Sequence, residues 1–177
     1  RWLAEGKVKE RIVAVPGQKI NLGDGVDVEV IVTSGNGWLD RLATLYPVFV
    51  KKNPPSENDY SVGIKVSLAD FELFAAGDLS GENIVRRFGP VSMSYNDIES
   101  YIATSVGAIE VYRVNHHGSA HSSNACFTDL LNPEVSIVSS GRHNMYKHPH
   151  RSVYDRLKAT GDLYITDGIY ADLEVEL

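Results

Sequence analysis

The sequence predicts an α/β fold in which helices pack on a β-sheet. Two observations support this prediction. The first third of the chain contains short runs rich in Val and Ile, separated by glycine turns, as is typical of strands. Further along, apolar strand-like runs alternate with segments whose apolar residues recur at helical spacing. We therefore expect one domain over residues 1–177.

The composition fits a single domain with a hydrophobic core and limits its function. The chain has 177 residues, 43% of them hydrophobic, and a formal net charge of -6. Such a charge argues against a duplex-binding module held by bulk electrostatics, although a metal site with a local basic strip can still hold a phosphate. Because Cys126 is the single cysteine, a metal site would use mainly His, Asp, Glu or Asn.

The sequence contains neither a signal peptide nor an apolar run of about 18 residues, and we expect a cytoplasmic location. The chain begins with Arg1, not Met, which suggests a truncated or processed chain.

The secondary-structure elements can be assigned in order. Val26, Val28, Val30 and Val32 alternate with other residues, which predicts a strand with one buried face. Residues 34–59 are predicted to form a loop with a short helix near 39–46. The other predicted strands are 11–15, 18–22, 60–67, 71–76, 109–115, 134–140, 163–166 and 171–177. The other predicted helices are 81–88, 96–106, 122–131 and 150–160.

Three predicted strands end in polar residues of metal-binding type. Asp78 follows the first, His116 and His117 follow the second, and His148 lies in the loop after the third. Because ligands gather beyond the carboxyl ends of strands in α/β sheets, these side chains are expected to converge. A carboxylate and imidazoles are suitable ligands for divalent metals, which activate water for hydrolysis.

Each of these residues also has a structural interpretation. Asp78 could simply cap a helix, and adjacent histidines point to opposite sides of an extended chain, so only one of them would be a direct ligand. Clustering favours a site, since all six histidines fall between His116 and His150. We interpret His121, His143 and His150 as structural or solvated.

A basic strip follows the third strand. It contains Arg142, Lys147, Arg151, Arg156 and Lys158, with Asp155 as its only acid. Arg156 and Lys158 fit the solvated face of a helix. Arg142 and Lys147 lie in the loop with His148 and are candidates for holding a phosphate.

Four motifs together resemble the metallo-β-lactamase-fold domain of the ComEC family, known from bacterial DNA uptake. They are Asn58-Asp59-Tyr60-Ser61, Ala76-Gly77-Asp78, Asn115-His116-His117-Gly118-Ser119 and Asn144-Met145-Tyr146-Lys147-His148-Pro149. The resemblance runs from about Gly17 to the C-terminus. It implies an αββα sandwich. It also implies a hydrolase in which two divalent ions, Zn or Mn, activate a water molecule that attacks a phosphodiester.

The resemblance also implies roles for individual residues. Asp78 would bridge the metals, with His116 and His117 as the histidine pair beside them. The expected catalytic residues are thus Asp78, His116 and His148. The expected substrate-binding residues are Ser119, Arg142, Asn144, Tyr146 and Lys147.

One part of the family pattern is missing. The leading H-x-H-x-D-H signature, which supplies the other metal ligands, is absent, since no histidine precedes His116. Ala76 and Asn115 stand where the family usually has Thr and Pro. The chain therefore resembles the C-terminal half of the domain. A longer protein could contain the other half, a second chain could complete the site, or the domain could have lost its metals.

We therefore expect a metal-dependent phosphodiesterase, most simply a nuclease acting on DNA or RNA, once the N-terminal half is present. The alternative is a catalytically silent domain that acts as an interaction module in a larger assembly. A third possibility keeps the metals but hydrolyses an ester or lactam. A half-sandwich would expose an apolar sheet face, so an N-terminal partner, covalent or not, is expected in every case.

Overall fold

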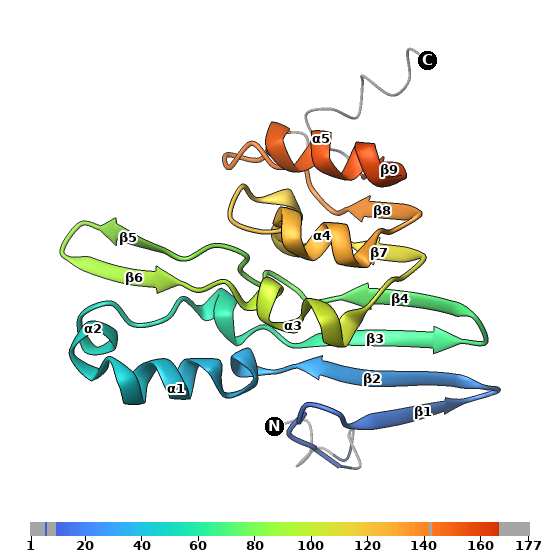
Figure 1. Ribbon diagram of the computed structural model, residues 1–177, viewed down its shortest axis with the longest axis horizontal. Helices are drawn as coiled ribbons and strands as arrows, with labels where there is room; N and C mark the ends of the chain where they lie inside the picture. Colours follow the sequence, from blue (N-terminus) through green and yellow to red (C-terminus); the bar gives the residue numbers. More distant parts are fainter. Residues whose placement is uncertain (1–5, 7–9, 142, 167–177) are drawn as a thin grey trace.

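The computed structural model describes residues 6, 10–141 and 143–166, and in this part of the chain it confirms the α/β class. A large mixed sheet has the strand order β1-β2-β3-β4-β7-β8-β9 (Figure 1). Its strands are β1 (Lys19–Gly23), β2 (Val26–Val32), β3 (Gly63–Leu68), β4 (Phe71–Ala75), β7 (Val111–Arg113), β8 (Val135–Val138) and β9 (Asp162–Ile165). The helices are α1 (Trp38–Leu45), α2 (Pro47–Lys52), α3 (Ile98–Val106), α4 (Ala125–Leu131) and α5 (Arg151–Thr160).

The sheet changes from antiparallel to parallel at β4. Strands β1 to β4 pair antiparallel in chain order, and β4, β7, β8 and β9 then pair in parallel. Parallel neighbours need crossover connections, and α3, α4 and α5 lie in these connections. The carboxyl ends of β4, β7 and β8 therefore meet at the same edge of the sheet.

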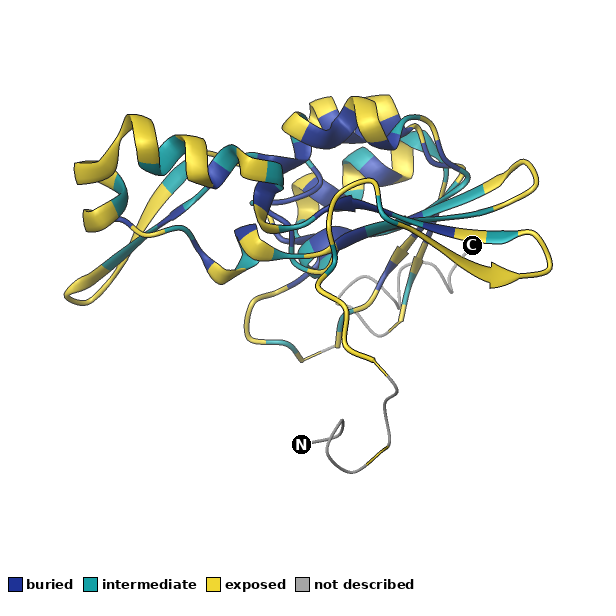
Figure 2. Cartoon of the chain, turned by 90° about the horizontal axis from the view of Figure 1, so that it is seen from below, coloured by how far each residue is buried: buried dark blue, intermediate teal, exposed yellow. Residues whose placement is uncertain are grey.

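The core lies between one face of the sheet and helices α3, α4 and α5 (Figure 2). Phe74 on β4, Tyr112 on β7 and Leu163 on β9 point into this core and are almost fully buried. The helices contribute apolar residues at helical spacing, such as Ile98 and Ile102 on α3. Each fully buried side chain of this kind stabilises the fold by roughly 1.5–3 kcal/mol.

The other face of the sheet also carries apolar side chains. The strand register places Val28, Val66, Leu73, Val111 and Val135 in one row on this face. All five lie outside the core cluster, and in the adjoining row Ile137 is 37% and Tyr164 57% exposed. Helices α3, α4 and α5 all cover the opposite face (Figure 2). The described part of the chain thus has the layers of half a sandwich.

A second, two-stranded sheet was not predicted. The helix expected over residues 81–88 is wrong, because this segment forms β5 (Ile84–Phe88), which pairs with β6 (Val91–Tyr95). Ile84 and Val85 are β-branched, and Gly89-Pro90 forms a two-residue turn, so a hairpin is locally favoured. In Figure 1 this hairpin lies beside α1 and α2, away from the large sheet.

Two other segments differ from expectation. The strand predicted over residues 11–15 is wrong, since these residues are described as irregular. Helix α2 begins at Pro47, a position that Pro favours, within the segment expected to be a loop. The predicted strand 171–177 lies outside the described residues. In the described ranges, none of the helices combines the length and apolarity needed to cross a membrane.

Candidate functional site

The three predicted strand ends do converge. Asp78 follows β4, the histidine pair follows β7, and Ser139 follows β8, all at one sheet edge. The backbone N–H of His116 donates to the Gly77 carbonyl over 2.9 Å, which joins the first two loops. Gly77 has a φ of +57°, so glycine suits the sharp turn before Asp78.

The histidine pair lies in a short 3₁₀ turn, η3 (Asn115–Gly118), and not in an extended strand. His116 and His117 both have positive φ, +49° and +56°, a conformation that is uncommon for residues with a Cβ. The two side chains are therefore not held on opposite sides of an extended backbone. The two rings nevertheless meet different neighbours: His117 faces Asp78, and His116 faces Asn58, whose Nδ2 lies 3.4 Å from its ring nitrogens.

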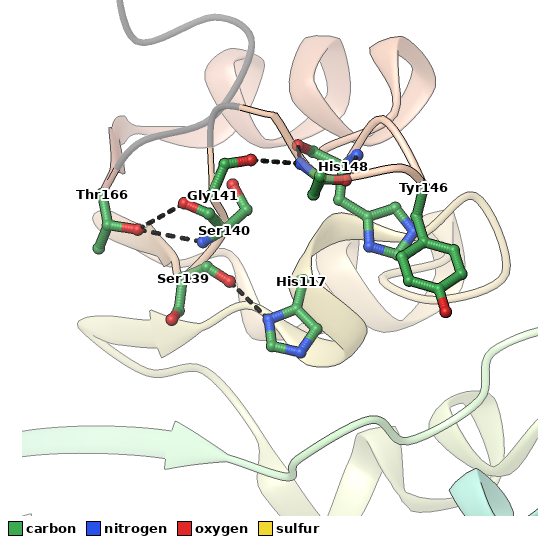
Figure 3. A pocket seen from close by; sticks show the side chains of 8 residues that line it. His117, Ser139, Ser140, Gly141, Tyr146, His148 and Thr166 are labelled. Atoms are coloured by element: carbon green, nitrogen blue, oxygen red, sulfur yellow. Dashed lines mark hydrogen bonds between the residues drawn. The ribbon is translucent and has the colours of Figure 1, made fainter.

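The contacts of His117 fix its tautomer. Its Nδ1 lies 2.5 Å from the carbonyl oxygen of Ser139 (Figure 3). Because a carbonyl oxygen only accepts, Nδ1 carries the hydrogen, and Nε2 faces Asp78 Oδ1 at 3.5 Å. In a neutral ring this leaves the lone pair of Nε2 facing the carboxylate, which is the arrangement of donor atoms that suits a metal ion.

His116 lies deeper in the site than His117. Burial lowers its pKa below the usual value, as do the neighbouring His117 and His121, whereas the Asp78 carboxylate acts in the opposite direction. A neutral imidazole keeps a lone pair available, as a metal ligand requires.

His148 lies beside both members of the pair. Its ring centroid is 5.7 Å from that of His116 and 6.4 Å from that of His117, and Tyr146 stacks on it at 5.7 Å. The pKa of His148 falls to about 4, mainly because the ring is buried and also because it neighbours His116 and His150. The neutral ring can act as a hydrogen-bond donor or acceptor near pH 7.

Asn144 holds the loop that carries His148. Its Oδ1 accepts a hydrogen bond of 2.8 Å from the backbone N–H of His148, and its Nδ2 donates to the His148 carbonyl over 2.9 Å. The amide is thus engaged within the loop. Substrate binding by Asn144 stays a prediction.

Two cavities flank the histidines. The first, of about 430 Å³, is lined by His117, Tyr146 and His148 together with Asn144, the 139–141 loop and Thr166 (Figure 3). The second has a volume of about 340 Å³ and also borders His148. Its lining residues are Arg86, Phe88, Tyr95, His116, Ser119, His121, Tyr146, His148 and His150. Ser119 and Tyr146, both predicted to bind substrate, therefore line a cavity beside the pair.

The remaining sequence predictions have different outcomes. Arg142 lies outside the described residues. Lys147 is exposed and lines neither cavity. His143 is exposed, as expected of a solvated residue, but His121 and His150 line the second cavity. The role of His121 was missed because its partners, Glu82 and Arg86, are far away in the sequence.

The described part of the chain does not contain a complete set of metal ligands. Within residues 6, 10–141 and 143–166, no three His, Cys, Asp or Glu side chains form a group that could hold a metal ion. Asp78 and His117 fit two positions of a metal shell by chemistry and tautomer. A closed zinc shell takes four ligands, so the others would come from elsewhere.

Comparisons with known proteins agree with the resemblance. The chain is 32% identical over 102 residues to Recombination protein 2 of Haemophilus influenzae, covering 58% of this chain and 11% of that protein. It is 31% identical over 141 residues to Competence protein ComA of Neisseria gonorrhoeae, covering 78% and 16%. It is 30% identical over 108 residues to ComE operon protein 3 of Bacillus subtilis, covering 60% and 12%. The chain thus spans less than a fifth of these relatives.

The other two comparisons add less. No protein-family model matches the chain. Among solved structures, a putative Zn-dependent hydrolase of the metallo-β-lactamase superfamily from Thermotoga maritima aligns with a TM-score of 0.44 at 14% identity, covering 88% of this chain and 71% of that one. On its sequence, this chain is a relative of the ComEC family of competence proteins and corresponds to one segment of those longer proteins.

Proposed function

We propose that this chain supplies part of the active site of a metal-dependent phosphodiesterase, most simply a nuclease. The proposal rests on the pairing of His117 with Asp78. Nδ1 of His117 donates its hydrogen to the Ser139 carbonyl, so Nε2 of the neutral ring, which faces the carboxylate, carries no hydrogen. A carbonyl bond on the other ring nitrogen is the usual arrangement of a metal-bound histidine.

Each candidate residue has a specific role in this function. Asp78, His117 and His116 would hold the metals, two Zn or Mn ions, and bound metals would supply Lewis acidity toward a phosphate and activate water. His148, neutral at pH 7, donates a hydrogen bond to an oxygen that gains negative charge. Ser119, Tyr146 and the loop with Lys147 and Arg142 orient the substrate, and Asn144 keeps His148 in place.

The remaining ligands would come from an N-terminal half, in the same protein or in another chain. Two observations support this part of the proposal. The relatives are several times longer than this chain, and one sheet face carries a row of apolar side chains away from the helices.

Phosphodiester cleavage by the complete protein tests the proposal. With added Mn²⁺ or Zn²⁺, we expect Asp78→Ala to lower cleavage of a single-stranded oligonucleotide by at least 100-fold, as loss of about 3 kcal/mol of transition-state stabilisation implies. The matched control is Asp70→Ala, which removes an exposed carboxylate from the β3–β4 turn. Equal activity of the two variants would disprove the assignment.

The alternative is a catalytically silent interaction module. It is favoured by the incomplete ligand set in the described residues. Metal content separates the two functions: a purified complete protein that retains no Zn or Mn after dialysis against micromolar metal supports the module.

A further inference from the structure

The hairpin β5–β6 lies beside α1 and α2, and together they form an arm of the fold (Figure 1). The arm differs in charge from the rest of the chain. Ser92 on β6 donates a hydrogen bond to the Lys52 carbonyl at the end of α2, which ties the two parts of the arm together. Residues 38–56 and 84–95 contain one acid, Asp40, and five basic residues: Arg41, Lys51, Lys52, Arg86 and Arg87. This local excess of positive charge occurs in a chain of net charge -6.

One face of the hairpin points to the histidines. Alternation along β5 and its register with β6 place Arg86, Phe88 and Tyr95 on the same face, and all three line the second cavity with His116 and His148. Arg87 lies on the opposite face of the strand. The cavity therefore connects a basic and aromatic surface with the candidate metal ligands.

His121 fixes the position of Arg86. Its Nδ1–H donates to the carboxylate of Glu82, and its Nε2 accepts a hydrogen bond from the Arg86 guanidinium. Both contacts are compatible with one tautomer of the His121 ring, in which Nδ1 carries the hydrogen and Nε2 does not. The His121 ring thus links the Arg86 guanidinium at the second cavity to Glu82. The aromatic ring of Tyr95 lies 6.1 Å from that of His121.

Phe88 and Tyr146 both contribute aromatic side chains to the lining of this cavity. They are 52% and 67% exposed, so part of each side chain is accessible to a ligand. Planar side chains beside an arginine are the usual means of binding unpaired bases and their phosphates, independently of sequence.

We propose that the hairpin face formed by Arg86, Phe88 and Tyr95 binds a single-stranded polynucleotide and leads it to the histidine pair. The inference rests on the proposed phosphodiesterase function and names the substrate and the residues that hold it. Arg86 contacts a backbone phosphate, and Phe88 stacks on a base next to the scissile bond. A duplex offers no unpaired base for Phe88, and an anionic membrane surface needs neither stacking nor the narrow cavity.

The test is binding of a labelled 15-nucleotide oligo(dT) to the complete protein in EDTA, measured by fluorescence anisotropy. Without metal, cleavage plays no part in the result. We expect Arg86→Ala to weaken binding about tenfold and to reduce the slope of log K against log salt by about 0.7, as for one lost phosphate contact with a single strand. Arg86→Lys should retain that slope. Phe88→Ala should weaken binding roughly tenfold with an unchanged slope.

Arg87→Ala is the matched control, since it removes the same charge from the other face of the same strand. We expect it to change affinity by less than about threefold. Four results would each overturn the inference. Two concern the variants: equal effects of Arg86→Ala and Arg87→Ala, or unchanged binding by Phe88→Ala. Two concern the ligand: equal affinity for a duplex of the same length, or binding to phosphatidylserine vesicles in place of the oligonucleotide. Failure of cleavage with intact, Arg86-dependent binding would count against the proposed catalysis alone.

Discussion

Asn115 donates a hydrogen bond of 2.8 Å from its side chain to the buried carboxylate of Glu99. The same carboxylate accepts bonds from the backbone N–H groups of Ser123 and Asn124, over 2.7 and 2.9 Å. Glu99 on α3 thus holds both the turn with the histidine pair and the start of α4. Asn115 stands where the ComEC-like pattern usually has Pro, and the structure gives this asparagine a specific partner.

Replacing Asn115 by Asp should destabilise the chain. The change removes a donor to Glu99 and places a second carboxylate beside it in a fully buried site. We expect the free energy of unfolding to fall by about 2–4 kcal/mol, measured by urea denaturation. Asn132→Asp, at an exposed left-handed position that tolerates either residue, should change it by no more than about 0.5 kcal/mol. Similar losses in both variants would contradict the role of the Glu99 contact.

Stability should depend on pH through Glu99. Burial raises the pKa of Glu99 from 4.5 to about 7, although its hydrogen bonds to Asn115, Asn124 and Ser123 lower it. The folded state therefore binds the proton of the Glu99 carboxyl group more tightly than the unfolded state does. The stabilisation of the folded state by this proton is complete below pH 4.5 and is lost as the pH rises to 7. The loss is about 3 kcal/mol.

Glu99→Gln isolates this effect, since all other ionisable groups are common to both proteins. The difference in unfolding free energy between the native chain and Glu99→Gln should shift by about 3 kcal/mol between pH 4.5 and 7.5. A constant difference across this range would show that Glu99 keeps an ordinary pKa.

Gly118 should be essential for the contact between the two histidine loops. Its φ is +79°, and a Cβ there would lie 2.6 Å from the Cβ of Pro149 and 3.0 Å from its Cα. Gly118→Ala is expected to cost about 2–3 kcal/mol of stability and to move His148 away from His116. Gly141→Ala is the control, because a Cβ at Gly141 meets no described atom within 4 Å. Unfolding midpoints of the two variants check this prediction, and equal midpoints would refute it.

Metal binding should depend on His117 and not on His143. In the complete protein, His117→Ala removes a nitrogen that faces Asp78, and we expect the affinity for Zn²⁺ to fall by about 100-fold. His143 is exposed and serves as the control. Isothermal titration calorimetry of both variants measures the difference. Unchanged affinity in His117→Ala would exclude His117 as a ligand.

The sequence was a good guide where a signal is local or periodic. The alternation in Val26–Val32 identified β2, and polar residues after three buried runs predicted that Asp78, His116 and His117 meet at one sheet edge. The β5–β6 hairpin was missed because Ile84–Phe88, read alone, fits either a helix or a strand. Pairing with β6 decided the outcome.

The sequence by itself determined the α/β class, the ligand types available for a metal and the absence of a histidine before His116. Only the tertiary structure decided which nitrogen of His117 faces Asp78, that His121 holds Arg86, and that a basic hairpin reaches the site. The physical reason is distance along the chain. A hydrogen bond between Ser139 and His117, or between Arg86 and His121, leaves no local pattern in sequence, because its partners become neighbours only when the sheet has formed.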